Sequence, residues 1–302
     1  MKPSVALTLL TLGFLGPQRA IRADAFLDVN GVFTTINVPG ASETSAGGIN
    51  DLGQIVGFYR VTPNSGGHGF IDTNGVFTTI DFPGAEATAP FAINNSGQIV
   101  GLYEDSANIE HPFWYVNGAF TTLNGGFATG INNVGQIVGS IGVETFVYMN
   151  GSYSIFAVPG AGGATPGGIN DAGQIAGYYG DPTTGVTHGF LKTGANFTTI
   201  DVPGVAYTAP SAINNTGEIV GTYIGSDTEH GFLDINGTFI TVDFPGASRT
   251  NANGINNTGD IVGAFTPGTP TPEPASILLF ATGLACIVIL IGRKRMTRTS
   301  TY

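Results

Sequence analysis

GINDLGQIVG (Gly48–Gly57) recurs five more times along the 302-residue chain with only small changes. The shared isoleucine, Ile49 in this copy, returns at intervals of 44, 38, 38, 44 and 42 residues. Self-similarity at such a period predicts a repeat architecture in which each copy is one supersecondary unit. The other copies are AINNSGQIVG (Ala92–Gly101), GINNVGQIVG (Gly130–Gly139), GINDAGQIAG (Gly168–Gly177), AINNTGEIVG (Ala212–Gly221) and GINNTGDIVG (Gly254–Gly263).

Each copy is predicted to be a strand, a tight turn and a second strand. Asn50 and Asp51 suit the turn because their side chains bond neighbouring backbone groups and tolerate left-handed conformations. Gly53 supplies the remaining positive φ at no steric cost. The density of Gly and Asn excludes a helix here.

A complete unit of about 40 residues contains four short strands. In the unit Gly69–His111, Asn74-Gly75 is the strongest short-range hairpin signal, because both central positions of a type I′ turn need positive φ. The expected strands are Phe70–Thr73, Val76–Phe82, Ala89–Ile93 and Gln98–Tyr103.

Six such units predict an all-β fold, a six-bladed β-propeller of four-stranded antiparallel blades over residues 26–267. A solenoid is the alternative, but the variable spacing favours a ring in which one connector differs between units. Two arrangements of the ring stay open. Either each blade follows the repeat frame, or the blades are offset and the two termini share one blade.

Hairpin geometry places the Asn-Gly turns and the Asn-rich turns on one rim. The Pro-Gly loops and the variable connectors then lie on the opposite rim, which is the better candidate for binding because loops carry function more often than scaffolds do. Its candidate residues are His68, Glu104, Asp105, His111, Asp181, His188, Glu229 and His230.

The four histidines occupy equivalent positions in different units, and this spacing argues against a metal site. Zinc needs its ligands within about 2.1 Å of one point, whereas equivalent residues are spread around a ring. Hydrogen bonding within the connector is the favoured interpretation. Trp114 replaces an aliphatic residue of other units, so core packing is favoured over a sugar-stacking platform.

The sequence contains no Gly-x-Ser-x-Gly elbow, phosphate loop or His-Glu-x-x-His motif, so no catalytic residue and no cofactor is predicted. Asp72-Thr73-Asn74-Gly75 faintly resembles a calcium loop but lacks the bidentate Glu. The hairpin interpretation explains the same residues, and calcium is kept as the alternative.

Charge excludes one class of partner. Residues 26–271 hold three basic and 19 acidic residues, a net charge of −16. Such a surface repels phosphate backbones, so no nucleic-acid binding is expected.

Both ends of the chain predict export. Lys2, an apolar run at residues 5–15 and Ala23-Asp24-Ala25 match a secretory signal peptide over residues 1–25, with cleavage at the Ala-x-Ala site after Ala25. Near the other end, a Pro-rich linker at residues 268–274 precedes an apolar stretch, Ala275–Gly292, that is barely long enough to span a bilayer. The basic tail at residues 293–302 is expected to stay cytoplasmic.

This C-terminal order resembles the PEP-CTERM sorting signal of Gram-negative bacteria. The resemblance implies recognition by an exosortase-type enzyme and display at the cell surface or in the extracellular matrix. The chain would be anchored, at least transiently, in the membrane through the apolar helix. The residues that would carry the signal are Pro272, Glu273, Pro274, Arg293, Lys294 and Arg295.

The repeats resemble those of bacterial extracellular HAF-repeat proteins, whose units carry His-Ala-Phe, a strand, Asn-Gly and a later Ile-Asn run. His68-Gly69-Phe70 and three similar tripeptides match with the Ala replaced, and the unit with Glu144-Thr145-Phe146 lacks the His. The resemblance implies an exported propeller-like module and leaves its ligand open.

Two functions from different classes follow. The leading hypothesis is a non-enzymatic binding, adhesion or scaffolding module that contacts extracellular polysaccharide or surface proteins. The alternative is a secreted polysaccharide hydrolase or lyase that uses the rim carboxylates Glu104, Asp105, Asp181 or Glu229.

Overall fold

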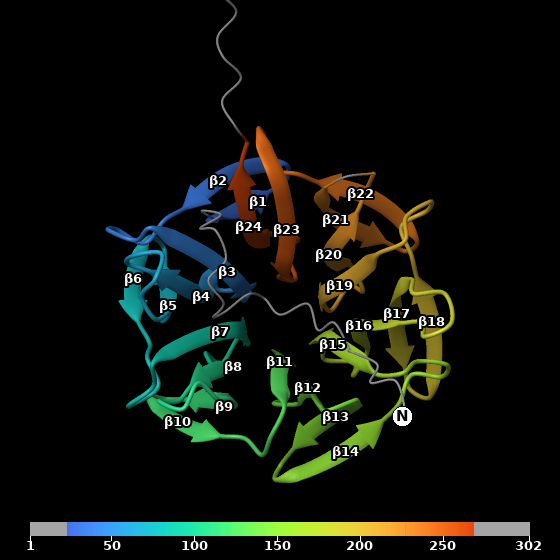
Figure 1. Ribbon diagram of the computed structural model, residues 1–302, viewed down its shortest axis with the longest axis horizontal. Coiled ribbons are helices and arrows are strands. Elements are labelled where there is room, and N and C mark those ends of the chain that lie inside the picture. The colour runs from blue at the N-terminus through green and yellow to red at the C-terminus, as the bar shows by residue number, and fades with distance from the viewer. Residues whose placement is uncertain (1–22, 227, 269–302) are drawn as a thin grey trace, which may run out of the picture. The chain divides into compact units, whose positions relative to one another are not determined.

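The computed structural model describes residues 23–226 and 228–268, which form 24 strands in six four-stranded antiparallel sheets. The sheets stand around a common axis like the blades of a propeller (Figure 1). This confirms the predicted six-bladed propeller and rules out the solenoid. The described part of the chain contains no helix long and apolar enough to cross a membrane. The predicted signal peptide, except Ala23–Ala25, and the predicted C-terminal helix and basic tail lie outside the described residues.

Five blades are built from consecutive strands, which follow one another from the axis outward. Blade 1 contains β3 (Glu43–Ile49), β4 (Gln54–Arg60), β5 (His68–Thr73) and β6 (Val76–Thr79). Blade 2 contains β7 (Ala87–Ile93), β8 (Ile99–Glu104), β9 (Glu110–Val116) and β10 (Ala119–Thr122). Blade 3 contains β11 (Phe127–Ile131), β12 (Ile137–Ile141), β13 (Glu144–Met149) and β14 (Ser152–Phe156). Blade 4 contains β15 (Ala164–Ile169), β16 (Ile175–Gly180), β17 (Thr187–Thr193) and β18 (Asn196–Ile200). Blade 5 contains β19 (Thr208–Ile213), β20 (Ile219–Ile224), β21 (Glu229–Ile235) and β22 (Thr238–Val242).

Blade 6 combines strands from both ends of the described chain. Its inner strands are β23 (Ala247–Ile255) and β24 (Ile261–Pro267), and its outer strands are β1 (Asp24–Val29) and β2 (Val32–Ile36). β1 pairs with β24 from Asp24 opposite Phe265 to Asp28 opposite Ile261. The blades are therefore offset from the repeat frame, and this shared blade fastens the ring using residues 24–267 alone.

Two adjacent apolar residues of each repeat, Ile-Val in five copies and Ile175-Ala176 in one, belong to two different interfaces between blades. Ile55 packs in a cluster with Val262 of blade 6, whereas the adjacent Val56 packs against Ile99 and Phe113 of blade 2. Successive side chains of a strand point to opposite faces of the sheet, so a blade buried on both faces needs two apolar residues in a row. All six clusters of the core join neighbouring blades in this way.

The glycine that ends each repeat makes room for a phenylalanine on the adjacent strand. Gly57 lies opposite Phe70, and a Cβ at Gly57 would collide with the carbonyl oxygen of Ser45 and touch the Phe70 ring. Phe70 is fully buried, as are its five counterparts in the other blades: Phe26, Phe113, Phe146, Phe190 and Phe232.

The turns divide between the two faces of the ring as the sequence predicted. Asn74 and Gly75 have φ values of 55° and 84°, as a type I′ turn requires. This turn joins β5 to β6 on the same face as the Asn-rich turn between β3 and β4, which we call the turn face. The Pro-Gly loops and the connectors between second and third strands of each blade lie on the opposite, connector face.

We expect the exported chain to retain Ala23–Ala25, because these residues belong to blade 6. Ala25 is fully buried, and the Ala23 carbonyl accepts the backbone N–H of Thr44 at 3.1 Å. A chain that starts at Phe26 loses these interactions, at about 1 kcal/mol for each hydrogen bond. Its melting temperature should lie several degrees below that of a chain starting at Ala23, roughly 2–4 °C per kcal/mol for a domain of this size.

Thermal unfolding of fragments 23–268 and 26–268 measures this difference. N-terminal sequencing of the exported protein tests the corresponding cleavage. A mature chain that begins at Phe26 with unchanged stability would contradict the expectation.

Candidate functional site

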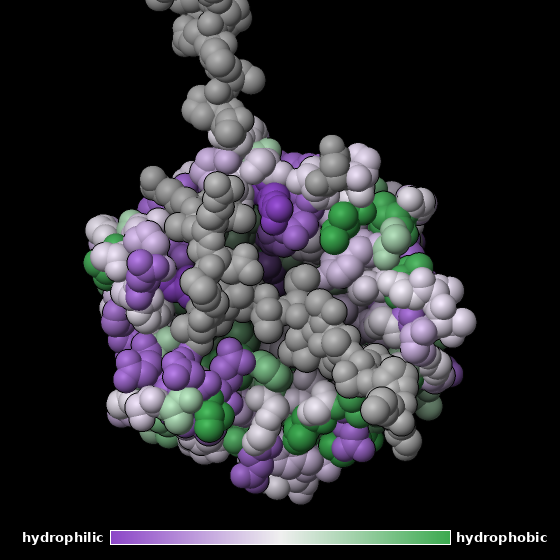
Figure 2. All heavy atoms as spheres, in the orientation of Figure 1, coloured by the Kyte–Doolittle hydropathy of each residue, from purple (hydrophilic) through white to green (hydrophobic). Residues whose placement is uncertain are grey.

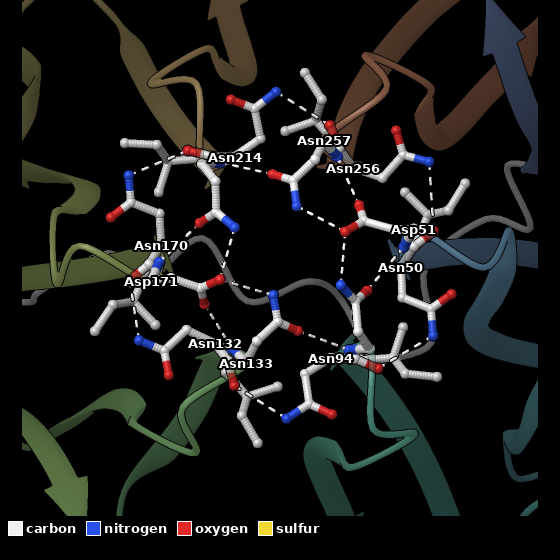
Figure 3. A pocket seen from close by; sticks show the side chains of 18 residues that line it. Asn50, Asp51, Asn94, Asn132, Asn133, Asn170, Asp171, Asn214, Asn256 and Asn257 are labelled. Carbon is white, nitrogen blue, oxygen red and sulfur yellow. Dashed lines mark hydrogen bonds between the residues drawn. The ribbon is translucent and has the colours of Figure 1, made fainter.

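A ring of buried asparagines lines the turn-face end of the central channel (Figure 3). The Oδ1 atom of Asn50 accepts the backbone N–H groups of Leu52 and Gln54 within its own turn, at 3.1 and 3.0 Å. Its Nδ2 atom donates to the Gln54 side chain and to the Asn94 backbone carbonyl of the next blade, 3.1 Å away. The equivalent bond between blades, at 2.9–3.3 Å, is made by all six members of the ring: Asn50, Asn94, Asn132, Asn170, Asn214 and Asn256.

The next residue of each turn forms a second ring whose side chains point toward the axis (Figure 3). The backbone N–H of each residue donates to Oδ1 of its counterpart in the following blade at 2.7–2.9 Å. In chain order the members are Asp51, Asn95, Asn133, Asp171, Asn215 and Asn257.

The two aspartates stand three positions apart in this ring of six. The Oδ2 atom of each accepts the side-chain amides of both neighbours at 2.6–2.9 Å. Burial alone would raise the pKa of Asp51. The backbone N–H of Asn257 and the amides of Asn95 and Asn257 outweigh burial and lower that pKa below its ordinary value. Every carboxylate therefore lies between amide donors and none faces another carboxylate.

The channel is narrow beyond the two rings. Six isoleucines, one from each repeat, separate two chambers of about 70 Å³ each. The inner strands approach so closely that a Cβ on Gly168 would lie 2.9 Å from Cα of Ala212 in the next blade. The turn-face end of the channel is thus a small chamber, lined by side chains that hold the ring together.

The channel opens at the connector face into a mouth of about 160 Å³. Each inner strand has a β-bulge here, and bulges re-aim side chains and often lie next to functional sites. Unlike the asparagine rings, the bulged position differs from blade to blade. Its residues are Gly47, Phe91, Thr129, Gly167, Ser211 and Asn253.

Hydrogen bonds to neighbouring blades fix part of this mouth. Thr129 Oγ1 donates to the Pro166 carbonyl at 2.7 Å, and Asn253 Nδ2 donates to the Ala46 carbonyl at 2.8 Å. Phe58, Tyr178, Ser45 and Thr165 complete the wall together with three prolines. No charged residue lines the mouth within the part of the chain that the structure describes. The space-filling view shows hydrophilic and hydrophobic residues intermingled over the blades on this face (Figure 2).

The four rim histidines lie in four different blades, and each binds a nearby aspartate. Each histidine ring also lies against a tyrosine, with centroids 5.0–5.5 Å apart. The sequence favoured hydrogen bonding within the connector, and only the His111–Asp105 pair has that form, because the other three aspartates lie in the Pro-Gly loop after the fourth strand. The pairs, at 2.7–2.8 Å, are His68–Asp81, His111–Asp105, His188–Asp201 and His230–Asp243.

Local structure also engages two of the four rim carboxylates. Asp105 accepts the backbone N–H groups of Ala107 and Ile109 in addition to its contact with His111. Asp181 accepts the backbone N–H of Thr183 at 2.7 Å and the Thr184 hydroxyl at 2.8 Å. These carboxylates order their own connectors, so neither is an unengaged acid or base.

Glu229 and Glu104 differ from these two. Glu229 lies 3.9 Å from an Arg249 guanidinium nitrogen on blade 6. Glu104 is only 3 % exposed, and its Oε2 has no hydrogen-bond partner among the described residues. Burial raises the pKa of Glu104, and the negative charges of Glu110, Asp105 and Glu86 raise it further. The eight predicted rim residues thus lie on one face but are spread over four blades, and apart from the Asp105–His111 pair of blade 2 the structure brings none of them together.

The structure describes the residues of two further predictions, the core packing of Trp114 and the calcium alternative at Asp72. Trp114 packs against the core cluster between blades 2 and 3, as predicted, with its ring 6.4 Å from that of Tyr148. The Asp72 carboxylate accepts the Gly75 backbone N–H at 2.7 Å, as the hairpin interpretation requires. Residues 23–226 and 228–268 contain no group of three or more His, Cys, Asp or Glu side chains placed to hold a metal ion.

Comparisons with known proteins give one sequence motif and several similar folds. Residues 270–295 match the PEP-CTERM protein-sorting motif, and no curated protein matches the sequence. A protein from Agrobacterium tumefaciens assigned as TolB has a TM-score of 0.60 at 12% identity, covering 81% of this chain and 98% of that one. An inactive variant of virginiamycin B lyase from Staphylococcus aureus, with quinupristin, has a TM-score of 0.43 at 11% identity, covering 76% and 97%. AofleA from Arthrobotrys oligospora has a TM-score of 0.44 at 11% identity, covering 80% and 81%.

The fold and the motif together define an exported β-propeller protein. More particularly, this chain is a six-bladed propeller with a PEP-CTERM signal, and that signal implies processing by an exosortase-type enzyme. The likeness to the Agrobacterium tumefaciens structure, at 12% identity, bears on the fold alone.

The sequence predicted the face of the mouth but not its residues. Phe91, Ser211 and Asn253 belong to no motif, and only the β-bulge that the inner strands share makes them equivalent positions. One signal was present: the residue two positions before the shared isoleucine varies among copies whose other positions agree.

We expect Asp51→Asn to destabilise the propeller. The substitution replaces an acceptor of two amide N–H groups with a donor that faces them. An unsatisfied group costs about 1–3 kcal/mol when buried, and these half-buried groups should cost about 1 kcal/mol. Because the pKa of Asp51 is lowered in the folded state, its stabilising effect is present above the unfolded pKa and is lost as pH falls through the folded value. The variant should therefore differ from the native protein at pH 7 and approach it in acid.

Thermal unfolding across pH 3–7 measures this effect. Glu144→Gln, which removes a charge from an exposed position, serves as the control. Equal melting temperatures of Asp51→Asn and Glu144→Gln at pH 7 would refute the role of the ring.

Glu104→Gln should act in the opposite direction. A raised folded-state pKa means that Glu104 favours folding when protonated and disfavours it as pH rises above the unfolded value. The variant should melt roughly a few degrees above the native protein at pH 7 and equal it near pH 4. Calorimetry at the two pH values tests this, and a lower melting temperature of the variant at pH 7 would contradict it.

Proposed function

We propose that this protein is an exported, non-enzymatic binding module that holds an extracellular ligand at the connector-face mouth of its channel. One observation carries the proposal. The same bulged position, repeated six times around the axis, holds residues of five different types, whereas the asparagine positions at the other end are nearly uniform. Positions that are the same in every blade stabilise the ring. A concave surface whose side chains differ from blade to blade is suited to ligand recognition.

The rim carboxylates support binding better than catalysis. Paired carboxylates in glycoside hydrolases stand about 5–10 Å apart across the scissile bond. Here Asp105 and Asp181 are engaged in their own connectors, and Glu104 is buried in blade 2. The alternative of a polysaccharide hydrolase or lyase would need acids at the mouth, and its described lining contains none.

The setting of this module follows from the sorting motif and the resemblance of the repeats. The proposal includes display on a Gram-negative cell surface or in its polysaccharide matrix, with the 275–292 segment as the membrane anchor before processing. The HAF-repeat resemblance supports the same setting. Partners would be extracellular polysaccharide or surface proteins.

Binding of fragment 23–268 to extracellular polysaccharide and to cell-surface protein fractions tests the proposal. Ser211→Tyr places a large side chain in the mouth, and Ser96→Tyr adds the same side chain to an exposed turn on the opposite face. We expect Ser211→Tyr to weaken binding at least tenfold and Ser96→Tyr to leave it unchanged.

Turnover assays on the same fractions separate the two functions. Product formation that Asp181→Asn or Glu229→Gln abolishes would overturn the proposal in favour of the enzyme. Equal binding by both tyrosine variants would show that the mouth is not the site.

A further inference from the structure

The size of the mouth sets the size of its ligand. A cavity of about 150 Å³ in a protein core accommodates one benzene ring. The mouth measures about 160 Å³, whereas each chamber behind it measures about 70 Å³. A single six-membered ring therefore fits, and it cannot pass the isoleucines toward the turn face.

The lining sets the charge of the ligand. Transferring an ion into a site without a charged partner is costly, and the described lining has none. Anions are also disfavoured by the 19 acidic residues of the propeller segment. The ligand that fits is neutral.

The lining also sets the kind of ring. Phe58 and Phe91 supply aromatic surface. Around them lie hydroxyl groups and one amide, from Ser45, Thr129, Thr165, Tyr178, Ser211 and Asn253. Thr129 Oγ1 and Asn253 Nδ2 already donate to neighbouring blades, so the groups that remain to bind a ligand are the Ser45 and Ser211 hydroxyls and the Asn253 side-chain carbonyl oxygen. An aromatic hydrocarbon would bury these groups without partners, at a cost for each of about 1–3 kcal/mol. A pyranose can place its C–H face on an aromatic ring and direct its hydroxyls to such groups.

We infer that the mouth binds one neutral pyranose, presented as the end unit of an extracellular glycan chain. This inference rests on the proposed function and names the ligand class of the same site. An end unit fits because the mouth is closed behind by the isoleucines, so a chain cannot thread through it.

The test measures binding of methyl glycosides of glucose, galactose, mannose and rhamnose to fragment 23–268 by saturation-transfer NMR and calorimetry. Sodium glucuronate is the charged comparison. At least one neutral glycoside should bind saturably and at least tenfold more tightly than glucuronate. Ser211→Tyr should weaken that binding at least tenfold, and Ser96→Tyr should not change it.

Phe91→Ala provides a second variant that adds no bulk, and it should also weaken binding. Melting temperatures of all variants identify any that fail to fold. Absence of saturable binding by every neutral glycoside, or equal binding by Ser211→Tyr, overturns the inference. If the fragment still binds a surface fraction in a manner that Ser211→Tyr abolishes, the pyranose inference alone fails and the proposed function stands.

Discussion

The structure depends on a closed circle of buried amides at the axis. Each first asparagine of a turn, such as Asn50, donates one N–H within its turn and the other to the next blade. An aspartate has no N–H to donate, and an apolar residue would leave a buried carbonyl unpaired, at about 1–3 kcal/mol. Because the circle returns from Asn256 to the carbonyl of Asn50, each turn must match its neighbours in length and height. This constraint explains why the turn sequence is repeated so closely.

The constraint at the axis leaves the rest of each unit free to differ. The two-residue turn at Gly142-Val143 and the longer connector at residues 61–67 join the same pair of strands in different blades. Both are accommodated because they lie on the connector face, away from the circle. The shared blade 6 closes the ring by strand pairing: β1 hydrogen-bonds to β24 and places Phe26 opposite Gly263. The ring is held by amides at its centre and by strand exchange at its edge.

The sequence predicted what local chemistry decides. Asn74-Gly75 encodes a type I′ turn, and the Ile spacing encodes the number of blades, so strand order and rim assignment followed. The sequence could not predict which four strands form one blade. It gives the order of the strands along the chain, but it does not show which strand of each unit lies next to the axis. The second ring shows the same limit. Asp51 and Asp171 look like turn residues in the sequence, and only closure makes them acceptors for amides of adjacent blades.

Repetition separates the structural residues of this protein from those available for recognition. The histidines of the rim recur with the same aspartate or tyrosine contacts, and such recurrence is what a structural role produces. The bulged residues occupy the same backbone position and all line the mouth. Their side chains nevertheless differ: Phe91 is aromatic and Asn253 is a polar amide. Packing of the ring does not require that difference, because the bulge leaves the side chain outside the ladder. The six bulged positions are equivalent by symmetry but carry different side chains. They can therefore bind a ligand that itself has no sixfold symmetry.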